Sequence, residues 1–203
     1  MEKNVVNLKK HNSVNLKKAA PNLVRVGLGL GWTSPKGIKV DLDLSVFPVN
    51  ATGFCNSEDF LFYGVQDDAV TGMKHTMNKA LTHTGDDETG DSSTDGDDET
   101  VIIELTKLNQ SIVKLVAVAT VHEKISTGMK FSAANDAYIR VYDADTQEEL
   151  TRYAFEKENT NATALEFISL DKDATGNWHV VAIGEGCNDG LAGLCAKFKI
   201  GVE

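Results

Sequence analysis

The sequence predicts an all-β fold, a β-sandwich of about ten strands with one or two short helices, in a single domain over residues 1–203. Segments in which apolar and polar residues alternate recur along most of the chain, and a period of two is that of a half-buried strand. Turn-forming residues separate these segments at short intervals. Apolar residues make up 41% of the 203 residues, which is enough for one sizeable core.

Three segments give the clearest strand signals. Residues 23–30 (LVRVGLGL) and 38–47 (IKVDLDLSVF) alternate with a period of two. Residues 112–122 (IVKLVAVATVH) are apolar at nearly every position, which predicts a central strand that is covered on both faces. Further strands are expected at residues 60–63, 101–105, 137–143, 150–155, 164–170 and 178–184.

Helical signals are few. Residues 191–198 (LAGLCAKF) place apolar side chains at positions i, i+3, i+4 and i+7, which predicts a short helix. A turn of helix is also expected at residues 54–60 or 125–131, and residues 73–81 are a further helical candidate. The helices are therefore minor additions to a sheet protein.

The N-terminal segment is basic and begins with a repeat. The pentad VNLKK occurs at residues 6–10 and again at 14–18, and each copy alternates as a short strand does. Residues 1–40 contain eight basic residues and one acidic residue, although the whole chain has a net charge of −10. Nucleic-acid binding requires a broad basic face, so no nucleic-acid partner is expected. The lysines are interpreted instead as exposed residues on edge strands, where charge discourages pairing with other chains.

Cysteine usage and hydropathy indicate the compartment. The three cysteines, Cys55, Cys187 and Cys195, form no C-x-x-C pair, which argues against a disulfide framework and a zinc knuckle. Buried free thiols in a reducing compartment are expected. The sequence has neither an apolar run of 18 residues nor an N-terminal apolar region of the signal-peptide kind. We therefore expect a cytoplasmic protein without a transmembrane segment.

The acidic segment at residues 85–100 (GDDETGDSSTDGDDET) contains the pentad GDDET twice, and eight of its sixteen residues are acidic. A dense block of like charge is typical of a solvated, disordered spacer. Three glycines lie within the segment and a predicted strand follows it, and glycine lets the backbone turn tightly around a ligand. A cation site is therefore the second interpretation.

A second acidic cluster supports the cation site. Asp41 and Asp43 lie in the predicted strand at residues 38–47, and side chains at i and i+2 share one face of a strand, with Cα atoms about 6.5–7 Å apart. Aspartate is disfavoured in strands, and such departures from local preference are expected mainly at functional sites. The two aspartates and the acidic segment together predict a site built from a strand and a loop.

Oxygen ligands from carboxylates and from carbonyls in glycine-rich turns suit Ca²⁺, which takes six to eight of them at about 2.3–2.6 Å. The EF-hand pattern is not met, because a loop that begins at Asp91 has Ile102 where the pattern requires glutamate. Magnesium is an alternative that keeps more water. Zinc or copper would require histidine or cysteine ligands, and only His83 lies beside the segment.

Recognised catalytic motifs are absent from the sequence. It contains neither G-x-S-x-G nor H-E-x-x-H. The stretch GLGLG at residues 27–31 lacks the spacing of a dinucleotide loop, and its glycines predict close backbone packing or a bulge. His122 and Glu123 are interpreted as a structural pair at a strand end. The alternative to a non-enzymatic protein is a metal-dependent hydrolase that uses paired carboxylates.

Several segments, in order along the chain, resemble one known family. They are VNLKK…VNLKKAAP near the N-terminus, VGLGLGW at 26–32, VDLDLSVF at 40–47, SEDFLFY at 57–63, the acidic residues 83–100, NDAYIRVYD at 135–143, GNWHVVAIGEG at 176–186 and GLAGLCAKF at 190–198. The chain thereby resembles the TerD family of tellurium-resistance and stress-response proteins. The resemblance implies a β-sandwich that binds two calcium ions through acidic loops and has no enzymatic activity. It also implies complexes with other resistance proteins at the inner face of the membrane.

The resemblance also implies a ligand set. From the D-L-D segment and the acidic loop it assigns Asp41, Asp43, Asp86, Asp97, Asp98 and Glu99, and it adds Asp59, Asp87 and Asp91 as further candidates. The chain departs from the family pattern in two places. Asp87 stands where the family has asparagine, and residues 91–95 (DSSTD) replace a run of alternating glycines. The loop is therefore more acidic than the family pattern.

Overall fold

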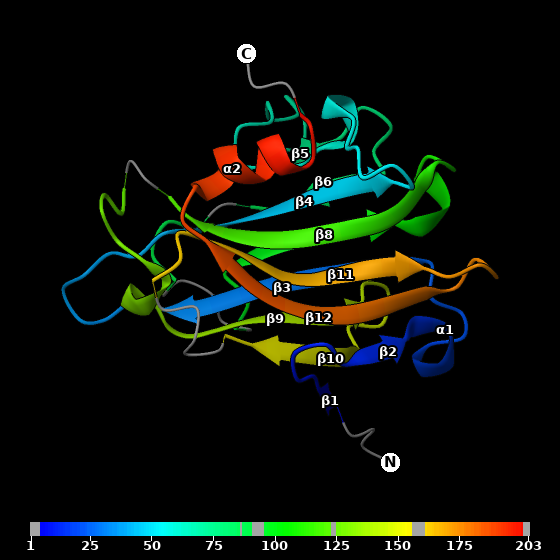
Figure 1. Ribbon diagram of the computed structural model, residues 1–203, viewed down its shortest axis with the longest axis horizontal. Coiled ribbons are helices and arrows are strands. Elements are labelled where there is room, and N and C mark those ends of the chain that lie inside the picture. Colours follow the sequence, from blue (N-terminus) through cyan, green and yellow to red (C-terminus); the bar gives the residue numbers. More distant parts are fainter. Residues whose placement is uncertain (1–4, 86, 91–95, 123–124, 156–160, 201–203) are drawn as a thin grey trace.

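Two β-sheets form the protein, as the sequence predicts (Figure 1). The computed structural model describes residues 5–85, 87–90, 96–122, 125–155 and 161–200. The seven-stranded sheet has the order β1-β10-β9-β3-β7-β6-β5 and the five-stranded sheet the order β2-β12-β11-β8-β4. The strands of the larger sheet are β1 (Val6–Asn7), β3 (Arg25–Thr33), β5 (Lys74–His75), β6 (Leu81–His83), β7 (Glu99–Glu104), β9 (Asn135–Asp143) and β10 (Glu149–Ala154). Those of the smaller sheet are β2 (Ser13–Asn15), β4 (Leu42–Asn50), β8 (Ile112–Val121), β11 (Ala164–Lys172) and β12 (Trp178–Cys187).

Helices are short and lie outside the sheets. The described residues contain α1 (Leu16–Ala19), α2 (Gly190–Lys197) and three 3-10 helices at Ser57–Asp59, Leu105–Lys107 and Phe131–Ala133. The helix predicted at residues 191–198 is confirmed as α2. The prediction of a helix at residues 73–81 is wrong, because the tight hairpin of β5 and β6 occupies that stretch. None of the helices in the described residues combines the length and hydropathy that crossing a membrane requires.

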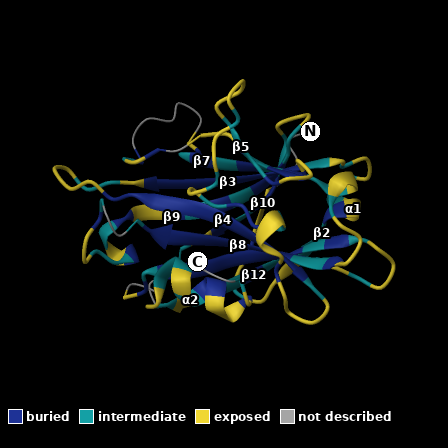
Figure 2. Cartoon of the chain, turned by 90° about the horizontal axis from the view of Figure 1, so that it is seen from above, coloured by how far each residue is buried: buried dark blue, intermediate teal, exposed yellow. Residues whose placement is uncertain are grey.

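Strand β4 shows how the alternating sequence fills two apolar layers. Leu42, Leu44 and Val46 point into the core between the sheets. Phe47 and Val49 point to the opposite side, into a second apolar cluster on the outer face of the five-stranded sheet. Helix α2 covers this outer cluster, and its buried and exposed sides are both visible in Figure 2. The prediction that residues 112–122 form a covered central strand is confirmed, because β8 lies between β4 and β11 and contributes to both layers.

Two strand predictions need correction. The second VNLKK copy is a strand only up to Asn15, whose side chain then accepts a hydrogen bond from the Lys18 N–H at 2.9 Å and caps α1. An N-cap of this kind stabilises a helix where the local alternation alone predicts a strand. Residues 60–63 form no full strand, and only Leu61 pairs, in an isolated bridge with Val46 on the edge of β4.

The glycines of β3 allow close packing, as the sequence predicts. A Cβ atom on Gly27, Gly29 or Gly31 would overlap the side chain of Tyr142, Asp97 or Tyr138. The pairing of β3 with β9 also shifts register between Gly31 and Thr33. Because glycine has no Cβ atom, these side chains can lie flat against the sheet.

The three cysteines all belong to the outer apolar cluster and none is in a disulfide. Burial raises the pKa of the Cys55 thiol to about 12, and burial also raises the pKa of Cys195. Cys187 is partly exposed. The expectation of free thiols is confirmed.

Candidate metal centre

The candidate site forms where β4 begins and β8 ends. These strands pair antiparallel, with Leu42 opposite Val121, so Asp41 lies opposite His122. The His122 N–H donates a hydrogen bond to the Asp41 carbonyl oxygen at 2.9 Å. Residues opposite each other in a sheet share a face. Asp41, Asp43 and His122 therefore all project from the outer face of the five-stranded sheet.

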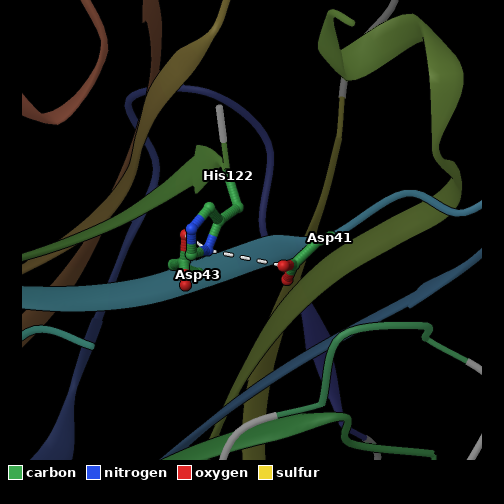
Figure 3. A group of neighbouring side chains, drawn as sticks. All are labelled: Asp41, Asp43 and His122. Atoms are coloured by element: carbon green, nitrogen blue, oxygen red, sulfur yellow. Dashed lines mark ion pairs between the residues drawn. The ribbon is translucent and has the colours of Figure 1, made fainter. Parts of the chain in front are cut away.

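The three side chains converge, as Figure 3 shows. His122 Nδ1 lies 3.4 Å from Asp41 Oδ2 and 3.3 Å from Asp43 Oδ2. One potential ligand atom of each residue lies within 4.8 Å of the others. Both aspartate side chains are only 1% exposed, whereas that of His122 is 19% exposed. Among the described residues, this is the group of three or more histidine, cysteine and acidic side chains that could hold a metal ion.

A turn and an aromatic ring support the group. The Asp41 N–H donates to Ser126 Oγ at 2.9 Å, and the Ser126 N–H donates to the His122 carbonyl at 2.8 Å. The Tyr63 ring packs against the His122 imidazole, with ring centroids 4.9 Å apart. These contacts hold the start of β4 and the end of β8 in a fixed relation.

A cavity of about 460 Å³ opens beside the group. Asp43 and His122 line one side of it. Most of the other lining residues come from the turn after β8, such as Lys130, and from the start of α2, such as Asn188 and Gly190, and Thr163 before β11 adds to them. A small molecule in this cavity would lie next to the aspartate and the histidine.

The described part of the acidic loop folds against the segment before β4. Ser34 Oγ donates to the Thr89 carbonyl at 2.6 Å, and Lys39 Nζ lies 2.5 Å from Glu88 Oε2. Trp32 links both segments, since its N–H donates to Asp98 Oδ2 at 2.8 Å and its Nε1–H donates to the Val40 carbonyl at 2.9 Å. The loop and the Asp41 segment therefore occupy one end of the sandwich, although they belong to different sheets.

Asp87 shapes this loop. Its Oδ1 accepts hydrogen bonds from the Thr89 N–H at 2.7 Å, from Thr89 Oγ1 at 2.8 Å and from the Gly90 N–H at 3.2 Å. This is the pattern of an aspartate turn. Gly90 has φ of 65° and lies against the Trp32 indole, where a Cβ atom would overlap the ring.

Asp97 forms an ion pair with an arginine side chain of the protein. Arg140 Nε lies 2.8 and 2.7 Å from its two oxygens, and Arg140 Nη2 lies 2.6 Å from Oδ2. Tyr138 donates to Oδ1 at 3.1 Å. Burial, followed by the Asp97 charge, raises the pKa of the Tyr138 hydroxyl. Arg140 was not among the predicted site residues, because no local sequence pattern links it to the loop.

Glu99 joins the two sheets. Its Oε2 accepts a hydrogen bond from the Leu44 N–H on the edge of β4 at 2.5 Å and lies 3.3 Å from His83 Nε2. Glu99 and His83 are 1% and 2% exposed. The carboxylate thus satisfies an edge amide that the neighbouring strand does not reach.

The remaining predicted residues lie apart from this cluster or outside the described residues. Asp59 ends the 3-10 helix Ser57–Asp59, and burial raises its pKa. Asp86 and Asp91 fall outside the described residues. His122 was predicted only to pair structurally with Glu123, whereas the structure places its ring beside Asp41 and Asp43. The signal it lacked was the β4–β8 register, which local periodicity does not contain.

Solved structures share this fold. A Streptomyces coelicolor homologue of the telluride resistance protein TerD superposes with a TM-score of 0.65 at 18% identity, covering 90% of this chain and 100% of that chain. The structure described as that of the unknown-function protein SAV2460 superposes with a TM-score of 0.62 at 16% identity, covering 89% and 99% of the two chains. At these identities the likeness concerns the fold alone.

Relatives in sequence are closer. The tellurium resistance protein TerD of Serratia marcescens is 34% identical over 198 residues, covering 96% of this chain and 97% of the relative. General stress protein 16U of Bacillus subtilis is 33% identical over 201 residues, covering 97% of this chain and 98% of the relative. Residues 5–198 match the model of the TerD domain. The chain therefore belongs to the TerD family, whose named members include tellurium-resistance and stress proteins.

Proposed function

We propose that this protein is a non-enzymatic calcium-binding protein of the TerD type, which holds two Ca²⁺ ions at the end of the sandwich and acts as a calcium-dependent interaction module. The names of its relatives refer to tellurium resistance and general stress and describe no reaction. They support a role in resistance or stress response.

The observation that carries the proposal is the pair Asp41 and Asp43. Both carboxylates are 1% exposed and face the same imidazole. Adjacent buried carboxylates disfavour each other's ionised form, and burial of charge is costly. A divalent cation between them would offset both effects, which supports assigning these side chains to a metal.

The acidic loop supplies further oxygens at the same end of the molecule. A carboxylate oxygen has more than one lone pair, so a side chain that accepts a hydrogen bond can also coordinate an ion. Asp87 and Asp98 are the described loop residues that fit this role, because protein amides orient both. Asp97 instead fits a supporting role through Arg140. Several hard oxygen donors on a folded loop are the environment that Ca²⁺ requires.

A calcium titration of the chelator-treated protein tests the proposal. Calorimetry should give two ions per chain, and the melting temperature should rise with calcium and fall with EDTA. Free calcium at 100 times its dissociation constant should add about 2.7 kcal/mol per occupied site to the free energy of unfolding. Asp41→Asn should lose much of this gain. Asp136→Asn is the matched control, because this carboxylate is exposed at φ of 51°, a conformation that asparagine adopts readily. An unchanged melting temperature in saturating calcium would contradict the proposal.

The proposed partners are other tellurium-resistance and stress-response proteins at the inner membrane surface. Calcium would order the acidic loop against the Trp32 and Ser34 segment that it already contacts, and so fix the surface that partners meet. Affinity capture of purified candidate partners with calcium and with EDTA measures this. Equal capture in both conditions would argue for a passive calcium buffer.

A metal-dependent hydrolase is the second candidate, and the cavity beside Asp43 and His122 favours it. A hydrolytic metal needs an open coordination position and room for a substrate. Assays with phosphate and carboxylate esters, in the presence of Ca²⁺ or Mn²⁺, test this candidate. Turnover that disappears in Asp43→Asn would support it, and absence of turnover in the wild-type protein would reject it.

A further inference from the structure

We infer that Asp41, Asp43 and His122 form a binding site for a divalent transition-metal ion of the zinc class, with His122 as the third protein ligand. The inference rests on the proposed function, which makes the two aspartates metal ligands, and it adds a nitrogen ligand and a different class of ion. The strand site, which the proposed function assigns to calcium, would thus also accept an ion that prefers nitrogen ligands, whereas the oxygen-rich loop would hold calcium alone.

Donor chemistry is the first argument. Calcium and magnesium take oxygen ligands, whereas imidazole is a ligand for zinc and related transition metals. Two aspartates and one histidine are a donor set that Zn²⁺ accepts. The charges also match, because two carboxylates neutralise a divalent ion and a neutral imidazole adds no charge. A neutral assembly is the form that a site with two carboxylates at 1% exposure tolerates best.

Distance is the second argument. Zinc bonds to nitrogen and oxygen ligands are about 2.0–2.2 Å long, so neighbouring ligands in a tetrahedron are separated by about 3.3–3.6 Å. His122 Nδ1 lies 3.4 and 3.3 Å from the nearer oxygens of Asp41 and Asp43. All three potential ligand atoms fall within 4.8 Å of one another. An ion would therefore fit after small side-chain rotations.

Preorganisation is the third argument. Asp43 lies in β4 and Asp41 directly before it, whereas His122 directly follows the hydrogen-bonded neighbour β8. Ser126 fixes the backbone at Asp41 and at His122, and Tyr63 packs on the imidazole. Ligands on rigid paired strands lose little conformational entropy when an ion binds.

Access is the fourth argument. The cavity of about 460 Å³ is lined by both Asp43 and His122. It gives an ion a path from the surface, which any metal site requires. It also leaves room for water or a small ligand at a fourth coordination position, as in zinc sites with three protein ligands. The site is thus a partly open one.

The competing explanation is that a protonated His122 serves only as a counter-ion of the two aspartates. In that case His122 Nδ1 forms long ion pairs with Asp41 Oδ2 and Asp43 Oδ2, and no metal ion binds. Metal titration separates the two explanations, because a counter-ion has no reason to bind Zn²⁺ or Co²⁺.

The experiment uses the full chain after chelator treatment and dialysis. Co²⁺ is added while its visible absorption bands are followed, and Zn²⁺ is then added as a competitor. We expect one Co²⁺ per chain, displaced by Zn²⁺. His122→Gln should weaken Zn²⁺ binding at least about 10-fold. The control is His75→Gln, which alters a histidine on β5 whose ring contacts Thr82, and this variant should bind Zn²⁺ as the wild type does. Absence of Co²⁺ binding, or an unchanged affinity in His122→Gln, would overturn the inference.

Two further measurements keep the result clear. The NMR signals of the His122 ring in the wild-type protein should shift when Zn²⁺ is added, which needs no variant to fold; unshifted signals in saturating Zn²⁺ would also overturn the inference. Calcium titration of His122→Gln should still show loop binding. If calcium fails to bind while Zn²⁺ does, the proposed function fails and the zinc-class site stands. If calcium binds and Zn²⁺ does not, the zinc-class site is refuted and the proposed function stands.

Discussion

Two acidic regions lie at the same end of the molecule but differ in what surrounds their carboxylates. In the loop region, Asp97 forms an ion pair with Arg140, and Glu99 accepts a hydrogen bond from an edge amide of β4. In the strand region, Asp41 and Asp43 face each other across a single imidazole. The loop contains the higher density of acidic residues, yet the strand holds the group whose atoms converge.

The role of a carboxylate follows from its neighbours in space, as these two regions show. A buried acid beside an arginine stabilises the fold, and its removal leaves an uncompensated cation. Two buried acids beside each other disfavour the fold until a cation arrives. The two regions should therefore respond to neutralising substitutions with opposite signs, and the following experiments test that contrast.

The largest effect is expected for Asp97→Ala. The side chains of Asp97 and Arg140 are 3% and 14% exposed, so the substitution leaves a largely buried guanidinium with only its longer ion pair to Glu149, at 3.8 Å. The free energy of unfolding should fall by about 3 kcal/mol, measured by urea denaturation in EDTA. The control is Asp145→Ala, which breaks a pair with Arg25 whose side chains are 50% and 41% exposed and should cost about 0–1 kcal/mol. Equal losses in the two variants would contradict the structural role of Asp97.

Gly29→Ala should destabilise the same region from the opposite side. Its Cβ atom would overlap the Asp97 carboxylate and displace the ion pair. We expect a loss of about 2 kcal/mol, in the range for overpacked sites, measured by thermal unfolding. Gly85→Ala, at a position where a Cβ atom meets open space, is the matched control. A Gly29→Ala protein as stable as the wild type would show that Asp97 is not held against β3.

Asp43→Asn should have the opposite sign in the absence of metal. Removing one of two adjacent buried charges should raise the free energy of unfolding in EDTA by about 1 kcal/mol. The same variant should lose the stabilisation that is expected from the proposed metal binding. Melting curves in EDTA and in saturating metal measure both effects. A protein that is less stable than the wild type in EDTA would mean that the strand carboxylates stabilise the fold as Asp97 does.

The smallest effect is expected at Asp173, a turn carboxylate between β11 and β12. Hydrogen bonds from Thr175 and His179 hold its pKa below the ordinary value. A depressed folded-state pKa contributes stability that is present above the unfolded value of about 3.9 and lost as pH falls through the folded value. The difference between wild type and Asp173→Asn should therefore be small at neutral pH and shrink below about pH 4. Chemical denaturation across this range measures it, and a difference that grows on acidification would contradict the assignment.

Much of the fold could be predicted from the sequence. The alternation in residues 38–47 predicts both the strand and the common face of Asp41 and Asp43, and the glycines of residues 27–31 predict the close packing found on β3. Errors arose where a tertiary or capping contact outweighed local alternation. Asn15 caps a helix inside the second VNLKK copy, and residues 60–63 pair with β4 through Leu61 alone.

The all-β class, the membership of the TerD family and the face that Asp41 and Asp43 share follow from the sequence, because strand periodicity and family motifs are local properties of the chain. Tertiary packing is what brings His122 to Asp41 and Asp43, and Arg140 to Asp97. It also gathered the three cysteines into one apolar cluster. Pairing register and sheet packing bring together residues that are far apart in sequence, and no local pattern specifies which of them meet.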